Sequence, residues 1–328
     1  MTDPLLEVRN LRIEFPTRRG TLVAVDDVSL TIAPGEVLGV VGESGAGKSL
    51  TGAAIIGLLE PPGRIAAGEI KLAGLRIDNL PYDDMRKIRG REIGAIFQDP
   101  LTSLNPLYTV GQQLVETVTT HLNMSASAAR QRAVELLEAT GIPAAERRID
   151  HYPHQFSGGM RQRVVIALAL AAQPKLVIAD EPTTALDVSI QAQIISLLKK
   201  LCRDHGTAVM LVTHDMGVIA ETADRVAVMY AGRIVEIGPV ADVIHRPQHP
   251  YTVGLMGSIP SMATDVERLT QIDGAMPRLT AIPSGCAFHP RCTRVFERCT
   301  RERPDLMPAG TSRAACWLHE ASHLVRAA

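Results

Sequence analysis

The hydrophobic and polar positions of this chain follow two alternating periods. Residues 5–15 and 21–32 are rich in Val, Ile, Leu and Thr and predict two strands joined by a turn. Short apolar runs predict further strands at 36–41, 93–97, 176–179, 208–213 and 225–230. Helical spacing predicts helices at 47–59, 110–121, 126–140 and 190–204. The alternation indicates an α/β fold with a parallel sheet, whose binding sites lie at the carboxyl ends of the strands.

The pattern of apolar residues and the composition change at two places in the sequence. Strand patterns vanish between about residues 99 and 172, which predicts a helical subdomain inserted into the α/β core. Beyond residue 250 the chain is rich in Pro, Cys and Arg and has weak periodicity. We therefore expect a main domain over 1–250 and a small irregular extension over 251–328.

Composition narrows the class of protein. Lys and Arg number 34 against 35 Asp and Glu, and aromatic residues make up 3% of the chain. Bulk attraction to nucleic acid or anionic lipid is therefore not expected, and few rings are available to stack on bases. No apolar stretch approaches the roughly 20 residues that span a bilayer. The first ten residues lack the features of a signal peptide, so we expect a cytosolic protein that docks onto other components.

A phosphate-binding loop follows the third predicted strand. Gly42 to Ser49 match the pattern G-x-x-x-x-G-K-[ST], in which glycines let the backbone wrap around phosphates at a helix N-terminus. Lys48 is expected to reach the β- and γ-phosphates, and the Ser49 hydroxyl to bind Mg²⁺. The expected nucleotide-binding residues of this loop are Gly42, Glu43, Ser44, Gly45, Ala46, Gly47, Lys48, Ser49 and Leu50.

Polar residues follow three other predicted strands. Asp180 and Glu181 end an apolar run, where Asp180 fits a Mg²⁺ ligand and Glu181 a group that polarises the attacking water. Gln98 and His214 occupy equivalent positions after their own strands. Each is a candidate γ-phosphate or water sensor, and an ordinary structural role is the alternative. For the two acids the alternative is a solvated strand end.

A second glycine loop lies far from the first. Ser157-Gly158-Gly159-Met160 precedes an apolar helical run, and a loop of this kind at a helix start also suits an anion. The phosphates of the chain's own nucleotide are already accounted for by residues 42–49. From the residues alone, the ligand of the second loop stays open.

Four of the five cysteines lie near the C-terminus. Cys286, Cys292, Cys299 and Cys316 lack the C-x₂₋₄-C pairs of zinc sites and the ferredoxin spacings. A set of four thiolates suits an iron–sulfur cluster or zinc, and unliganded or partly paired thiols are the alternative. Arginines interleave with these cysteines and are candidates to offset the charge of a bound cluster, namely Arg291, Arg294 and Arg298. Cys202 is expected to be an ordinary core residue.

Taken together, these motifs resemble the ATP-binding subunits of ABC transporters. The order of the first glycine loop, Gln98, the second glycine loop, Asp180–Glu181, Ala185-Leu186-Asp187 and His214 carries the resemblance across about residues 5–250. The implied fold is a P-loop NTPase (RecA-like) core with an N-terminal antiparallel β subdomain, a helical signature subdomain and a Cys-rich extension. Met160 departs from the family's common signature, which has Gln there.

The resemblance narrows to the subfamily that powers dipeptide or oligopeptide uptake. Residues 97–106, the run 249–252 and the four-cysteine tail are similar to that subfamily, and Met160 is similar to its D-type subunits. Nickel and glutathione importers share these features, so the cargo stays open. A soluble ABC ATPase acting on nucleic acid or ribosomes is the alternative from another class. That alternative is disfavoured by a single cassette and the absence of net positive charge.

The resemblance also implies roles for individual residues. Glu181 would be the general base, while Lys48 and His214 would contact the γ-phosphate. Gln98 would help to bind Mg²⁺ and link the site to membrane subunits, and Asp187 would lie at a dimer interface. Phe15 would stack on adenine, with a simple strand-core residue as its alternative. The four cysteines would hold a structural [4Fe–4S] cluster, with zinc as the alternative.

The resemblance finally implies partners and a location. Two ATPase subunits, expected to be a heterodimer, would sandwich two ATP molecules head to tail. Ser157 to Met160 would then contact the γ-phosphate of ATP bound to the other subunit. Two integral membrane permeases and an extracytoplasmic substrate-binding protein would complete the importer. The chain would lie peripherally on the cytoplasmic face of the inner membrane.

Overall fold

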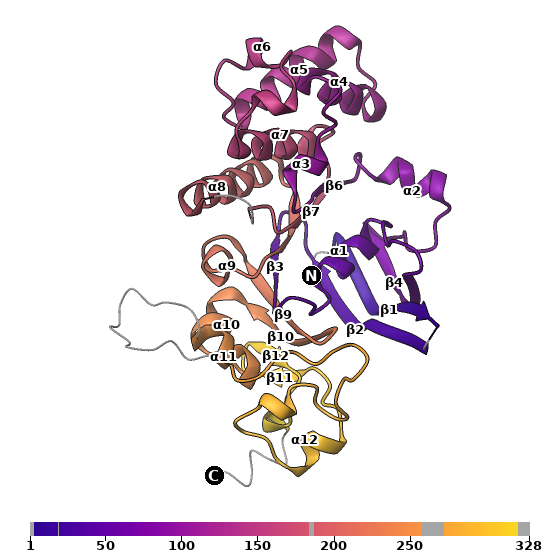
Figure 1. The fold of residues 1–328 in the computed structure, drawn as a ribbon, viewed down its shortest axis with the longest axis vertical. Coiled ribbons are helices and arrows are strands. Elements are labelled where there is room, and N and C mark those ends of the chain that lie inside the picture. Colours follow the sequence, from indigo (N-terminus) through magenta and orange to yellow (C-terminus); the bar gives the residue numbers. More distant parts are fainter. Residues whose placement is uncertain (1–2, 19, 184–186, 258–271, 321–328) are drawn as a thin grey trace. The chain divides into compact units, whose positions relative to one another are not determined.

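The structure is a computed structural model that describes residues 3–18, 20–183, 187–257 and 272–320 (Figure 1). The chain divides into two compact units. The first unit comprises residues 1–7, 31–37 and 71–212, and the second comprises 8–30, 38–70 and 213–328. Each unit contains its own run of paired strands and its own part of the candidate site.

Three parallel strands form the core of the first unit. They are β6 (Ile93–Ile96), β7 (Leu176–Asp180) and β8 (Ala208–Val212). Ile93 lies opposite Leu176, and Asp180 lies opposite Val212, so the strands run in register to their carboxyl ends. Nearly every residue of these strands is buried, which is why they read as continuous apolar runs in the sequence.

Helices make up most of the remaining first unit. The α4 helix begins at Thr109, whose hydroxyl accepts a hydrogen bond from the Gln112 amide in a reciprocal capping box. The α4 and α5 helices pack on each other and on α7, as Figure 1 shows. The elements are β5 (Leu75–Arg76), α2 (Tyr82–Ile88), α3 (Pro100–Ser103), α4 (Val110–His121), α5 (Ala126–Ala139), α6 (Ala145–Arg148), the 3₁₀ turn Pro153–Gln155, α7 (Gly158–Leu170) and α8 (Val188–His205).

Most of the N-terminal strands belong to the second unit. The strands β1 (Leu6–Thr17), β2 (Gly20–Ile32) and β4 (Arg64–Leu72) form a sheet in the order β2-β1-β4. The pattern of the sequence predicted β1 and β2 but missed β4. Most of β4 is exposed or half-buried, and Gly68 interrupts it with a φ of 96°, so the apolar alternation that marks a strand is weak there.

A second run of paired strands in this unit extends into the C-terminal region. The β3 strand (Val37–Val41) is parallel to β9 (Arg225–Tyr230), which turns into antiparallel β10 (Arg233–Pro239). The β10 strand then pairs with β12 (Ser312–Ala314), which pairs with β11 (Met307–Ala309). Residues far beyond position 250 therefore add strands to the same sheet as β10.

Short helices complete the second unit. They are α1 (Lys48–Ile55), α9 (Met216–Thr222), α10 (Val240–His245), α11 (Pro250–Gly257), α12 (Glu297–Arg301) and the 3₁₀ turns His289–Arg291 and Trp317–His319. Among the described residues of both units, no helix has the length and apolarity needed to cross a membrane.

Two leucines of the first unit provide a matched test of this packing. Leu114 on α4 is fully buried, whereas Leu107 just before that helix is 79% exposed. We expect Leu114→Ala to lower the free energy of unfolding by about 3 kcal/mol, because it leaves a cavity. Leu107→Ala should change it by less than about 0.5 kcal/mol. Denaturant titration of both variants measures the difference, and equal effects would contradict this placement of α4.

Candidate functional site

The phosphate loop connects β3 to α1 in the second unit. Gly42 has a φ of 149°, and a Cβ atom there would lie 2.2 Å from the carbonyl oxygen of Met229. Gly47 has a φ of 100° and stands directly before α1. Both positions, at the start of the loop and directly before α1, therefore require glycine.

Lys48 is held over this loop. Its side chain is buried, and its ammonium donates hydrogen bonds to the carbonyl oxygens of Gly42 at 2.8 Å and Glu43 at 3.1 Å. Ser49 is exposed in the first turn of α1, and Leu50 is half-buried behind it. The predicted order of a glycine loop, a lysine and a hydroxyl at a helix N-terminus is thus present as a physical arrangement suited to phosphate.

His214 and Phe15 also belong to the second unit. The Thr213 amide donates a hydrogen bond to the Val40 carbonyl near the end of β3 at 3.2 Å, and the next residue, His214, is exposed. Phe15 on β1 is half-buried rather than enclosed in a core, and its ring lies against Gly63. Neither residue has the full burial that a purely structural side chain of a strand core would show.

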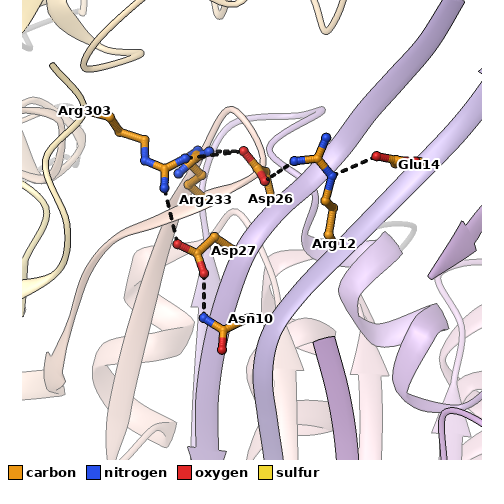
Figure 2. Close-up of polar contacts among 7 residues, drawn as sticks. All are labelled: Asn10, Arg12, Glu14, Asp26, Asp27, Arg233 and Arg303. Atoms are coloured by element: carbon orange, nitrogen blue, oxygen red, sulfur yellow. Dashed lines mark hydrogen bonds and ion pairs between the residues drawn. The ribbon is translucent and has the colours of Figure 1, made fainter. Parts of the chain in front are cut away.

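An ion-pair network joins the strand that carries Phe15 to other parts of the second unit (Figure 2). Arg12 on β1 pairs with Glu14 at 2.8 Å and with Asp26 on β2 at 3.0 Å. Arg233 on β10 also contacts Asp26, and Arg303 of the C-terminal region pairs with Asp27 at 3.4 Å. Arg64 on β4 also pairs with Glu14 at 3.6 Å, so the network connects strands β1, β2, β4 and β10 of the second unit.

Gln98, Asp180 and Glu181 meet in the first unit. Gln98 follows β6 and Glu181 follows β7, and the parallel register of these strands brings the two side chains together. The Gln98 amide donates a hydrogen bond to the Glu181 carboxylate at 3.0 Å. Glu181 has a φ of 45° and donates its amide hydrogen to the Val212 carbonyl at 2.8 Å, so its backbone is fixed in a left-handed conformation.

The second glycine loop caps α7 in the same unit. The Ser157 hydroxyl accepts a hydrogen bond from the Met160 amide at 3.4 Å, and Ser157 is exposed. The Met160 sulfur accepts from the Arg148 guanidinium at 3.1 Å. Gly159 passes close to Ile190 of α8, where a Cβ atom would lie 3.0 Å from a methyl group. Asp187 stands exposed before α8, while Ala185 and Leu186 lie outside the described residues.

The four C-terminal cysteines surround one cavity in the second unit. Cys286, Cys292, Cys299 and Cys316 line one pocket together with residues such as His289 and Phe288. Burial raises the pKa of Cys286 and of Cys316 to about 11. Cys202 lies apart from this cavity on α8 of the first unit, where burial raises its pKa to about 12.

Neither the expected [4Fe–4S] cluster nor its zinc alternative gains support from an arranged metal site. Among residues 3–18, 20–183, 187–257 and 272–320, no group of three or more His, Cys, Asp or Glu is arranged to hold a metal ion.

Two of the interleaved arginines have partners other than a cluster. Arg291 pairs with Glu43 of the phosphate loop at 2.9 Å. Arg298 pairs with Glu302 at 2.7 Å and lies over the Trp317 ring. Only Arg294 lines the cavity. The expectation that all three offset the charge of a cluster is therefore wrong for Arg291 and Arg298, because nearby carboxylates attract them first.

Sequence reasoning missed the role of two aromatic residues. The Tyr251 hydroxyl accepts a hydrogen bond from the Glu43 amide at 2.9 Å, and Phe288 packs against Tyr251 with ring centroids 5.4 Å apart. Neither residue has a recognisable spacing from the phosphate loop, since more than 200 residues separate them from it. Because the chain has few aromatic residues, each of them was a candidate for a specific packing role, and this was the signal that the sequence offered.

These features define the class of the protein. It has a phosphate loop after a buried strand, a pair of carboxylates at the end of another parallel strand, and a glycine loop at the start of a helix. Together these are the features of an ATP-binding cassette ATPase. Residues 25–184 match the family model described as "ABC transporter", and residues 235–299 match "Oligopeptide/dipeptide transporter, C-terminal region".

Known proteins agree over most of the chain. The chain is 48% identical over 318 residues to the oligopeptide transport ATP-binding protein AppD of Bacillus subtilis, covering 96% of this chain and 97% of that protein. It is 48% identical over 302 residues to OppD of Escherichia coli, covering 92% and 89%. The chain belongs to the ABC transporter family, as an ATP-binding protein of the oligopeptide/dipeptide transporter type.

Solved structures of ATP-binding cassettes resemble about three quarters of this chain. The dimeric cassette MJ0796 in a post-hydrolysis state with ADP and Pi has a TM-score of 0.65 and 32% identity, covering 72% of this chain and 98% of that one. CbiO1 from Clostridium perfringens has a TM-score of 0.64 and 29% identity, covering 77% and 96%. The expected P-loop NTPase fold with an antiparallel β subdomain is confirmed.

Two glycines test the geometry of the phosphate loop. We expect Gly42→Ala to abolish detectable ATP binding, because its methyl group would collide with the Met229 carbonyl. The matched control is Gly310→Ala, where φ is 65° but nothing lies within 4 Å of the added atom. That variant should lose about 1 kcal/mol of stability from backbone strain and keep its ATP affinity. Titration with a fluorescent ATP analogue compares the two, and normal binding by Gly42→Ala would refute the loop geometry.

Proposed function

We propose that this chain is the ATP-hydrolysing subunit of an importer for dipeptides or oligopeptides. The observation that carries the proposal is the extent of the match to oligopeptide transport ATP-binding proteins, which includes the C-terminal region as well as the cassette. Nickel or glutathione remains the alternative cargo within the same transporter class, because subunits other than this one contact the cargo. Action on nucleic acid has no support from the net charge of −1.

The residues divide the work of hydrolysis by their chemistry. In the second unit, the Gly42–Ser49 backbone binds the phosphates, Lys48 and His214 offset the charge that develops on the γ-phosphate, and Phe15 stacks on adenine. In the first unit, Glu181 accepts the proton of the water that attacks the γ-phosphorus, as the bond to ADP breaks. Mg²⁺ held by Ser49, Asp180 and Gln98 would neutralise phosphate charge when bound.

The Gln98–Glu181 hydrogen bond supports this assignment of the base. An amide that donates to one carboxylate oxygen fixes the direction of the carboxylate. The left-handed backbone at Glu181 also costs free energy, and such strain persists where the surrounding structure determines a functional position. Gln98 would therefore act as both an orienting residue and a link to other subunits.

The second glycine loop would complete the site of another subunit. Ser157, Gly158, Gly159 and Met160 offer amides at the start of α7, and Asp187 stands exposed before α8. We expect these residues to face ATP bound by a second, homologous ATPase subunit in a head-to-tail heterodimer. Two membrane permeases and an extracytoplasmic binding protein would complete the importer, with this chain on the cytoplasmic face of the membrane.

The C-terminal region would hold a structural [4Fe–4S] cluster. Four cysteine thiols around a single cavity are a ligand set suited to such a cluster, which takes one thiolate on each iron. We place the boundary of this extension after residue 250 and that of the helical subdomain at about 99–172.

The first test replaces the proposed base. Glu181→Gln should lower the rate of ATP hydrolysis by on the order of 10²-fold or more while ATP still binds, because the amide accepts no proton. Glu135→Gln, at an exposed position of α5, is the matched control and should keep the native rate. Phosphate release and ATP binding are measured on the assembled transporter. Unchanged turnover by Glu181→Gln would remove it as the base.

The second test concerns the cysteine cavity. Protein purified without oxygen should contain about four iron atoms and matching labile sulfide per chain. Cys292→Ala should lose this iron, whereas Cys202→Ala should retain it, because Cys202 lies outside the cavity. Metal analysis and the visible absorption spectrum report the result. Zinc without iron, or iron retained by Cys292→Ala, would contradict the cluster.

A further inference from the structure

The C-terminal region reaches the phosphate loop through one arginine. The Arg291 guanidinium donates hydrogen bonds to both carboxylate oxygens of Glu43, at 2.9 and 3.1 Å. Glu43 is the second residue of the glycine loop, and 248 positions separate it from Arg291. The Arg291 side chain is only 8% exposed, so this ion pair is largely shielded from the solvent and salt that weaken surface pairs.

All three nitrogens of this guanidinium are engaged. The Nε atom donates to the Asp273 carbonyl at 2.9 Å, and one terminal nitrogen donates to the carbonyls of Ile272 and Gly274, each at 3.3 Å. The other terminal nitrogen donates the hydrogen bonds to Glu43 and also one to the Tyr230 hydroxyl at 3.4 Å. A lysine, with a single ammonium group, cannot reproduce this planar set of contacts.

The backbone of Glu43 is held from the same side. Its amide donates to the Tyr251 hydroxyl at 2.9 Å, and Tyr251 is fully buried. Tyr251 packs on Tyr230 with ring centroids 4.7 Å apart, and Phe288 packs on Tyr230 at 5.3 Å. In a chain with 3% aromatic residues, three of them support this one residue of the phosphate loop.

Glu43 in turn contacts the residues that would bind phosphate. Its carbonyl oxygen accepts hydrogen bonds from the Lys48 ammonium at 3.1 Å and from the Ala46 amide at 3.2 Å. A shift of Glu43 would therefore move the ammonium group and the tight turn of the loop together. The side chain of Glu43 pairs with Arg291.

We propose that Arg291 is a positioning residue for the phosphate loop, which makes the C-terminal region a part of the nucleotide site. Arg291 fixes the carboxylate of Glu43, Tyr251 fixes its amide, and the loop is thereby held in the conformation that binds phosphate. The inference rests on the proposed function, since it assumes that ATP binds at residues 42–49. Arg291 itself touches no substrate.

A second contact between this region and the strands offers a matched control. Arg303 pairs with Asp27 at 3.4 Å and with Asp26 at 3.6 Å, as part of the network in Figure 2. This pair joins the C-terminal region to β2 and has no contact with the phosphate loop in the network drawn. Replacement of Arg303 therefore weakens attachment of the same region without releasing Glu43.

The experiment measures ATP affinity on the full chain by titration with a fluorescent ATP analogue. Arg291→Ala should raise the Kd by about tenfold, equivalent to about 1.4 kcal/mol. Arg291→Lys should restore part of the affinity, because it keeps the charge and loses the fork. Arg303→Ala and the exposed variant Arg301→Ala should bind ATP as the native chain does.

A double-mutant cycle separates positioning from general destabilisation. If Arg291 acts through Glu43, the double variant Arg291→Ala/Glu43→Ala should bind ATP no more weakly than the worse single variant. Additive losses would mean that the two residues act independently. Circular dichroism and thermal unfolding of each variant establish that the fold is intact before affinities are compared.

A reciprocal measurement does not depend on affinity. If the C-terminal region favours the binding conformation, ATP must stabilise that region by the same coupling free energy. Hydrogen exchange at amides 286–302 should therefore slow when ATP is added to the native chain, and this protection should vanish in Arg291→Ala.

The outcomes distinguish this proposal from the function on which it rests. If the native chain fails to bind ATP, the proposed function itself fails. If the native chain and Arg291→Ala bind ATP equally, or if Arg303→Ala is as weak as Arg291→Ala, only the positioning role is overturned.

Discussion

The pairing of buried parallel strands is the constraint on which the rest of the structure depends. Within the first unit, the register of β6 with β7 places Gln98 beside Glu181, since parallel strands end at the same edge. Within the second unit, the pairing of β3 with β9 brings the Met229 carbonyl against Gly42 and leaves room for no side chain there. The parallel strands are mostly apolar, so most of the polar candidate residues of the site lie at their carboxyl ends or just after them.

The C-terminal region is integrated into the second unit by different forces. Backbone pairing of β12 with β10 extends the sheet, and the rings of Tyr230, Tyr251 and Phe288 bury apolar surface beside it. Two arginines, largely buried Arg291 and exposed Arg303, then connect this region to the phosphate loop and to β2. Burial of the Arg291 pair costs desolvation, and its value lies in fixing one geometry more than in net stability.

The cysteines illustrate how far a spacing argument reaches. Their intervals match no common metal pattern, yet the fold gathers all four around one cavity, because loops rather than a regular motif supply them. The arginines between them were misjudged for a related reason. Because Arg291 is next to Cys292 in the sequence, we expected it to offset the charge of a cluster bound by the thiols. Its guanidinium instead pairs with Glu43. A sequence does not show which way a charged side chain points, and a carboxylate far away in the chain can be its nearest partner in space.

Local pattern and motif determined most of this protein. The period of apolar residues set the helices at 110–121 and 126–139 and the buried strands, and the glycine loops and strand-end acids indicated ATP hydrolysis before any coordinates. Tertiary structure alone decided the exposed strand β4, the hydrogen bond of Gln98 to Glu181 and the hold of Arg291 and Tyr251 on Glu43. The reason is physical: periodicity and backbone demands act over a few residues, whereas side-chain partners 83 to 248 positions apart meet only when the chain has packed.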